Sequence, residues 1–160
     1  MICATGCTTK EPEQTGQEDK PLPVFDLLLT DSSTHISTSS MQPGQPVVLF
    51  YFGPNCPYSR AQMDGIIEHI SLLKDIKFCV FTDWPFTEMK SFYKHYQLEK
   101  YSNMVVGNDY KSFFRSYFKV KGVPYMAIYG KNMRLNQAFK GKMSEKQIYE
   151  IAWTQNRIAQ

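Results

Sequence analysis

The sequence predicts an α/β domain with a central mixed sheet, helices on both faces of that sheet, and a strand or hairpin extension at its N-terminal side. Two observations lead to this class. Apolar runs alternate with amphipathic helical patterns through the middle of the chain, and two strands and a helix follow near its end. Alternation favours parallel strands joined by crossover helices, whereas a late hairpin adds antiparallel strands. With 160 residues, 42% of them hydrophobic, the chain can build one compact core.

Residues 1–21 contain few large apolar side chains, so burial would not offset the entropy lost when they become ordered. We therefore expect a flexible leader over 1–21 and a folded domain over 22–160. Small residues precede Cys7 and a polar stretch follows it, as at the end of a bacterial lipoprotein signal. Because the basic and long apolar parts of such a signal are not seen, a disordered leader with two incidental cysteines is the alternative. In the lipoprotein interpretation, Cys7 carries a lipid that anchors the domain to a membrane without spanning it.

The first half of the domain opens with a short apolar strand candidate at 24–30. The Ser/Thr-rich residues 31–40 predict a turn or hairpin, with Ile36 as a strand residue. Residues 47–52 are apolar without interruption, which indicates a central strand covered on both faces. From Tyr58 onward, apolar residues recur every three or four positions and predict a helix with one buried side.

The second half continues the alternation. Its predicted elements are a strand at 76–82, a helix at 87–98, a short strand at 104–106, a helix at 109–118, strands at 125–129 and 135–139, and a helix from 144 to about 158. Asp109 and Ser144 stand at the starts of two of these helices, where their side chains can accept hydrogen bonds from free backbone N–H groups. Gly130 and the two residues after it form the turn between the last two strands.

Composition excludes several function classes. The net charge is +3, from 18 basic and 15 acidic residues in a mixed pattern, and this does not indicate nucleic-acid binding. The four cysteines lie in no paired metal-binding spacing, so neither a metal site nor a cofactor is expected. No apolar stretch reaches the roughly 20 residues that span a bilayer.

Cys56 is the most informative residue. It stands between the apolar strand at 47–52 and the helical pattern that begins at Tyr58. At the start of a helix, free backbone N–H groups and the helix dipole stabilise negative charge, so the Cys56 thiolate is expected to be stabilised. Three positions later, where a dithiol redox motif has its second cysteine, the chain has Ser59.

Three segments together resemble the thioredoxin-like proteins, most closely the envelope TlpA/ResA type of thiol–disulfide oxidoreductase. The first is the strand, the Cys-Pro-Tyr-Ser motif at 56–59 and the helix after it. The second is the segment 118–124, which ends in Gly-Val-Pro. The third is the turn that begins at Gly130, followed by Gly141 and Ser144 before the last helix. The match covers 47–158, and 24–40 is similar to the N-terminal hairpin of the envelope type.

The resemblance implies that Pro124 follows a cis peptide bond and faces the cysteine. It also implies that the backbone of Val123 pairs with an extended substrate segment, as in strand addition. Pro57 and Tyr58, inside the motif, are the remaining candidates for substrate contact. Tyr58 could instead pack over the start of its helix, and that alternative stays open.

Serine cannot form a disulfide, so this motif cannot cycle electrons through an internal bond. Cys56 could still form mixed disulfides that another thiol resolves, with Ser59 donating a hydrogen bond to the thiolate. Two departures from the family pattern weaken catalysis: Phe50 stands where relatives have a buried polar residue, and Asn55 replaces an aromatic residue. Cys79 lies within a predicted strand and is interpreted as a buried, inert thiol.

The function expected first is therefore single-cysteine thiol–disulfide exchange with protein or small-molecule thiols. We expect a monomer in the bacterial cell envelope or periplasm. In the lipoprotein interpretation, this monomer is anchored through Cys7. The alternative from another class is a redox-silent module that binds extended polypeptides. A peroxiredoxin is disfavoured, since Gly53 stands where that family has a threonine three residues before its cysteine.

Overall fold

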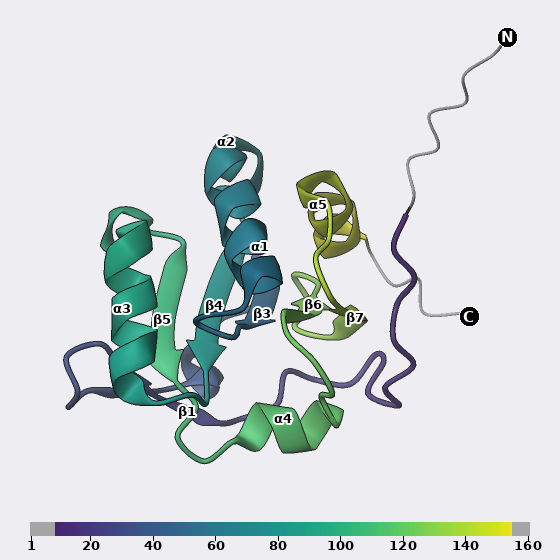
Figure 1. Ribbon diagram of the computed structural model, residues 1–160. Helices are drawn as coiled ribbons and strands as arrows, with labels where there is room; N and C mark the ends of the chain where they lie inside the picture. The colour runs from purple at the N-terminus through teal and green to yellow at the C-terminus, as the bar shows by residue number, and fades with distance from the viewer. Residues whose placement is uncertain (1–8, 155–160) are drawn as a thin grey trace, which may run out of the picture.

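The computed structural model describes residues 9–154, and these form a mixed seven-stranded sheet with helices on both faces (Figure 1). The strand order across the sheet is β2-β1-β5-β4-β3-β6-β7. Strands β3, β4 and β5 run parallel, and β6 and β7 add antiparallel strands beside β3. The antiparallel pair β1–β2 joins the opposite side through β5. The predicted α/β class, including its N-terminal hairpin, is confirmed.

The elements lie close to their predicted positions. The strands are β1 (Asp26–Leu29), β2 (His35–Ser37), β3 (Val47–Tyr51), β4 (Lys77–Thr82), β5 (Met104–Asn108), β6 (Tyr125–Tyr129) and β7 (Leu135–Lys140). The helices are η1 (Thr38–Ser40), α1 (Pro57–Glu68), α2 (Ile70–Leu73), α3 (Phe86–Tyr96), η2 (Leu98–Lys100), α4 (Phe113–Phe118) and α5 (Glu145–Trp153). The helix expected from Tyr58 onward is divided at His69 into α1 and α2.

Two apolar clusters cover the two faces of the sheet. One face packs against α1, α3 and α5, through buried residues such as Met63, Phe92 and Ile148. The other face packs against α4, through Phe114 and Phe118. Every residue of the central strand β3 is buried, as its unbroken apolar run predicted. The chain returns from β5 past β4 and β3 to the antiparallel β6, and the helix in this connection, α4, lies on the face opposite α1 and α3.

Both residues predicted to cap helices accept hydrogen bonds from helix starts, although the residue before α4 is Ser112 and not Asp109. The Ser144 hydroxyl accepts a hydrogen bond from the Gln147 N–H at 3.2 Å. The Asp109 carboxylate accepts from the N–H groups of Phe113 and Phe114, at 3.1 and 2.9 Å. The helix over 109–118 was predicted too long, because α4 begins only at Phe113 and Asp109 reaches it across a short turn.

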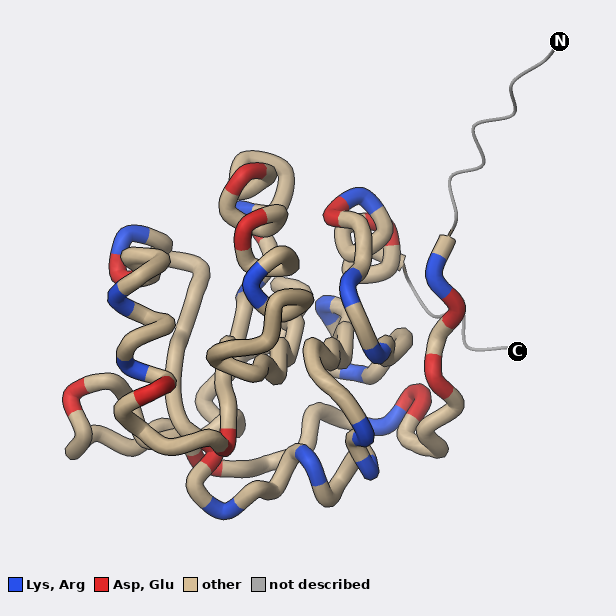
Figure 2. The backbone as a smooth tube through the Cα atoms, in the orientation of Figure 1, with Lys and Arg blue, Asp and Glu red and all other residues tan. Residues whose placement is uncertain are grey.

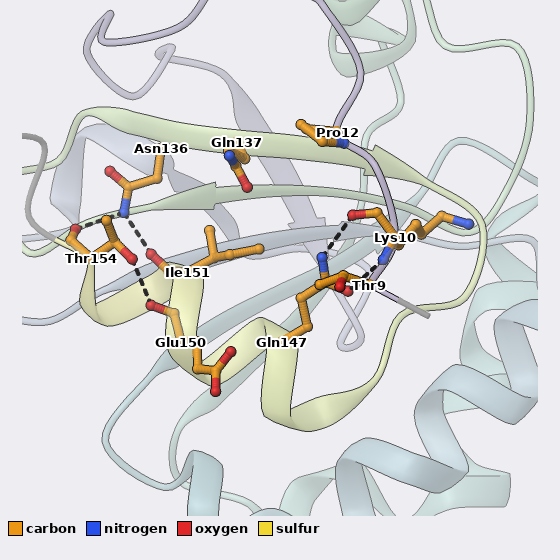
Figure 3. Close-up of a pocket in the computed structure, with 9 residues that line it drawn as sticks. All are labelled: Thr9, Lys10, Pro12, Asn136, Gln137, Gln147, Glu150, Ile151 and Thr154. Atoms are coloured by element: carbon orange, nitrogen blue, oxygen red, sulfur yellow. Dashed lines mark hydrogen bonds between the residues drawn. The ribbon is translucent and has the colours of Figure 1, made fainter. Parts of the chain in front are cut away.

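Residues 9–21 differ from the flexible leader that composition predicted. The Glu13 N–H donates to the Ala138 carbonyl at 2.8 Å, and the Leu135 N–H donates to the Lys20 carbonyl at 3.0 Å. Gln147 of α5 forms two hydrogen bonds with the backbone of Lys10, at 3.1 and 2.8 Å (Figure 3). The segment is held by backbone pairing with the outer strand of the sheet, so it needs few apolar side chains. Cys3 and Cys7, and the lipidation prediction with them, lie outside the described residues.

Candidate functional site

Cys56 lies at the junction between β3 and α1 and is the residue that precedes the helix. Its φ and ψ of −77° and 122° are extended, and Pro57 begins the helix. The Cys56 N–H donates to the Gly53 carbonyl at 3.0 Å, so the four residues 53–56 form a closed turn. Proline suits the first helical position because its ring sets φ for the helix and no N–H is lost there. The cysteine is partly exposed, as a reacting thiol has to be.

The segment before Pro124 faces this cysteine. The Val123–Pro124 peptide bond is cis, and the sulfur atom of Cys56 lies 3.7 Å from the Val123 carbonyl oxygen. Within residues 9–154, the Val123 N–H has no hydrogen-bond partner, and its carbonyl has only the Cys56 thiol. Among the described residues, Val123 therefore leaves its backbone N–H unpaired beside the cysteine, and its carbonyl oxygen accepts only the thiol.

Gly53 makes the close approach of these two segments possible. A methyl group on Gly53 would lie 2.9 Å from Cγ2 of Val123 and 3.1 Å from Cβ of Cys56. Both distances are shorter than ordinary carbon–carbon contacts. The absence of a side chain at residue 53 thus allows the cysteine turn to contact the loop of Val123.

Ser59 does not form the hydrogen bond to Cys56 that the sequence suggested. Its side chain is fully buried, and its hydroxyl oxygen accepts from the Gly53 N–H at 3.0 Å. Among the described residues, no hydrogen bond joins Ser59 to Cys56. Ser59 is the third residue of α1, so its bond to the Gly53 N–H connects the turn of residues 53–56 to the first turn of the helix.

The other candidates from the motif lie at the surface. Tyr58 is 67% exposed, so it does not pack over the start of its helix. Pro57 and Asn55 are exposed beside it. Phe50, where the family resemblance implied a buried polar residue, is fully buried among apolar side chains and offers no group to carry a proton.

Cys79 is enclosed in the core within β4 and is fully buried. Burial raises the pKa of its thiol to about 12, because a thiolate there would lose its hydration. No hydrogen bond or ion pair connects Cys56 to a histidine in the described part of the chain. Nor do residues 9–154 hold a group of three or more His, Cys, Asp or Glu side chains that could bind a metal ion.

A polar network that sequence reasoning missed lies beside Val123. The Tyr51 hydroxyl donates to the Asp83 carboxylate at 2.6 Å and accepts from Nη2 of Arg115 at 2.7 Å. Nη2 of Arg115 also donates to Asp83, at 2.9 Å, and the Asp83 side chain is only 5% exposed. Burial, and next the bond to Asp83, raise the pKa of Tyr51, so its hydroxyl stays protonated. These residues come from β3, the loop after β4, and α4, and no shared sequence motif connects them.

Tyr51 and Arg115 of this network line a groove of about 260 Å³. Trp84 and the segment from Val120 to Val123 complete its described lining. Nearby, Lys119, Lys121 and Lys140 line a second groove, and basic positions gather around the loop after α4 in Figure 2. A larger cavity of about 410 Å³ lies between residues 9–12, β7 and α5 (Figure 3). It has no cysteine among its described lining residues.

Comparison with solved structures decides the fold family. A secreted disulfide oxidoreductase of Mycobacterium tuberculosis, described as homologous to E. coli DsbE, superposes with a TM-score of 0.65 at 20% identity. The alignment covers 80% of this chain and 93% of that one. The chain has a thioredoxin-like fold. StoA from Bacillus subtilis is also similar to this thioredoxin-like chain, with a TM-score of 0.61, 15% identity, and coverage of 81% and 96%.

No family model and no curated protein matches the thioredoxin-like chain. Both solved structures are less than 25% identical to it, so the likeness shows the fold alone. Within residues 9–154, its longest helices are too short or too polar to cross a membrane.

Proposed function

We propose that this thioredoxin-like chain is a thiol–disulfide exchange protein that uses Cys56 as its reacting sulfur. One observation carries the proposal: a partly exposed cysteine at a helix start lies 3.7 Å from the carbonyl of Val123, whose N–H is unpaired among the described residues. The first group can attack a disulfide, and the second can align the chain that contains it.

The reaction has two balanced steps. The Cys56 thiolate attacks one sulfur of a substrate disulfide, the substrate S–S bond breaks, and the other sulfur leaves as a thiolate. Cys56 and the substrate are then joined by a mixed disulfide. Because Ser59 cannot resolve this bond, a thiolate from the substrate or from a second thiol attacks it and releases Cys56 with its electron pair.

The roles around Cys56 follow from placement. Val123 pairs with the substrate backbone, and Pro124 ends that pairing because it has no N–H. Tyr58 and Pro57 are exposed beside the sulfur and contact the substrate chain. Ser59 acts as a positioning residue through its bond to Gly53.

We also propose an extracytoplasmic location and action as a monomer. Support for the location comes from the structural relative that is described as secreted. Lipid attachment at Cys7 belongs to the same proposal and concerns residues outside the described part of the chain. Labelling of cells with a radioactive fatty acid tests it: the label should appear on the wild type and be lost in Cys7→Ser.

The exchange proposal is tested with the full chain carrying Cys3→Ser and Cys7→Ser. Incubation with a peptide disulfide should give a covalent adduct at Cys56, detected by mass spectrometry and released by dithiothreitol. The same chain with Cys56→Ser is the control and should form none. Absence of an adduct in both would contradict the proposal and favour the second candidate, a redox-silent module.

The second candidate is supported by the unpaired backbone of Val123 and by the apolar, buried Phe50. A module of this kind binds extended peptides through Val123 whether or not residue 56 is a cysteine. Peptide affinity measured by calorimetry should then be equal in the wild type and Cys56→Ser.

A further inference from the structure

The groove beside Val123 has the charge and shape to recognise a particular side chain. It begins at Val123, which also contacts Cys56, and continues along the loop to Val120. A substrate segment that pairs with Val123 therefore passes the groove close to its reacting sulfur. Strands advance about 3.3 Å per residue, so the nearest substrate side chains are those within about two positions of the cysteine.

Arg115 is held in place at this groove. Nε and Nη2 donate to the Tyr51 hydroxyl at 3.0 and 2.7 Å, and Nη2 donates to Asp83 at 2.9 Å. Its guanidinium also lies 5.3 Å from the Trp84 ring centre and 5.9 Å from that of Tyr51. Nη1 has no hydrogen-bond partner among the described residues. Because the Arg115 side chain is 49% exposed, this donor is accessible to a ligand. A fixed guanidinium with unused donors loses little entropy when it binds a carboxylate.

The residues that line the groove also carry a positive charge. Its described lining contains two cations, Arg115 and Lys121, and no acidic residue. Asp83 pairs with Arg115, is nearly buried and does not line the groove, whereas Lys121 forms no ion pair within residues 9–154. The rings of Tyr51 and Trp84 can pack against the methylene groups of a side chain whose carboxylate meets the cations.

Resting on the proposed function, we infer that this groove selects polypeptide disulfides with an acidic residue, best a glutamate, within about two positions of the reacting cysteine. Arg115 and Lys121 bind the carboxylate, and Val123 aligns the backbone. The groove thus makes the chain a selective exchange partner and raises the rate for acidic substrates.

The test uses two short peptides that differ in one residue, Glu or Gln, next to a cysteine joined to 2-nitro-5-thiobenzoate. The Cys56 thiolate attacks the peptide sulfur, the peptide–thiobenzoate S–S bond breaks, and the coloured thiobenzoate thiolate leaves. Its absorbance gives the rate with the full chain carrying Cys3→Ser and Cys7→Ser. The Glu peptide should react about five-fold faster than the Gln peptide, as expected for one exposed charge pair. The ratio should fall at high ionic strength.

Lys121→Gln should lower this Glu-to-Gln ratio toward one. Lys119→Gln, the matched control, removes the same charge from the same loop but does not line this groove, and it should keep the ratio. Equal rates for the two peptides would overturn the inference and leave thiol exchange standing. An equal loss of the ratio in both variants would overturn its assignment to this groove. If neither peptide reacts faster with the chain that has Cys56 than with the Cys56→Ser variant, the proposed function fails. This inference then fails with it.

Discussion

The sulfur of Cys56 lies 3.7 Å from the backbone carbonyl oxygen of Val123, although 67 positions separate the two residues. One of them starts α1, and the other precedes a proline at the start of β6. They meet because β3 and β6 are neighbouring antiparallel strands, with Tyr51 opposite Tyr125, so the end of one strand lies beside the start of the other. The sheet therefore brings a nucleophile and a strand-pairing site together, and four predictions follow from the surrounding contacts.

The two described cysteines should differ sharply in reactivity. In the full chain with Cys3→Ser and Cys7→Ser, a disulfide reagent such as dithionitrobenzoate should modify Cys56 alone under native conditions. Cys79 is fully buried, and burial raises the pKa of its thiol to about 12, so it should react only after unfolding. Titration of released thiobenzoate before and after addition of guanidinium checks this. Two thiols that react rapidly in the folded state would contradict it.

Replacement of Ser59 by cysteine should restore a dithiol motif. We expect the reduced form of Ser59→Cys to reduce a model disulfide and become a Cys56–residue 59 disulfide, and to turn over repeatedly when dithiothreitol is supplied as the reductant. The variant should lose roughly 1 kcal/mol of unfolding free energy, because the bond from the Gly53 N–H to the serine oxygen is removed. The combined variant Cys56→Ser with Ser59→Cys is the control and should be inactive. If oxidised Ser59→Cys closes the disulfide but shows no reductase activity, Phe50 and Asn55 become the residues to replace.

A methyl group at residue 53 should separate the cysteine turn from the loop of Val123. In Gly53→Ala the new carbon would lie 2.9 Å from Cγ2 of Val123, so one of the two segments has to move. We expect a loss of about 1–3 kcal/mol in the free energy of unfolding, measured in urea, and slower exchange at Cys56. Val123→Ala removes the clashing carbon. The double variant Gly53→Ala with Val123→Ala should therefore lose less free energy of unfolding than the two single variants lose together. A loss equal to that sum would contradict the steric explanation.

Removal of the Asp109 carboxylate should destabilise α4, the helix that carries Arg115. Asp109→Ala leaves two backbone N–H groups without acceptors, and we expect a loss of about 1–2 kcal/mol. Burial raises the pKa of Asp109 above its ordinary value of 3.8, against the opposing effect of those N–H bonds. The folded state thus binds the proton more tightly than the unfolded state. The contribution of Asp109 to the free energy of unfolding is therefore largest below pH 3.8. It falls as the pH rises through the raised pKa of the folded state.

Urea unfolding of the wild type and Asp109→Ala from pH 7 down to the acid range measures this dependence. The difference between the two should grow as the pH is lowered. The exposed Asp75 offers a matched control, and Asp75→Ala should cost less than Asp109→Ala at every pH. A difference that shrinks in acid would show that the N–H bonds, and not burial, dominate the Asp109 environment.

Much of the fold could be predicted because its signals are local. The apolar run of β3 and the three- and four-residue spacing of α1 each require only a short stretch of sequence. Ser144 capped its helix as predicted for the same reason. The start of α4 was less predictable, because Asp109 satisfies its first N–H groups from outside the helix.

The attachment of residues 9–21 could not be predicted from composition. Its contacts are mainly backbone hydrogen bonds to β7, and backbone groups are the same in every sequence. A segment poor in apolar residues can therefore be ordered when an outer strand offers unpaired N–H and carbonyl groups.

By itself, the sequence determined the α/β class, the positions of most helices and strands, and Cys56 at a helix start with Ser59 in place of a second cysteine. These properties depend on residue type and on neighbours a few positions away. Only the tertiary structure decided that Ser59 bonds to Gly53, and that Tyr51 and Arg115, both bonded to Asp83, line a groove beside Val123. Those contacts join segments far apart in the chain, and their distances depend on how the sheet and α4 pack.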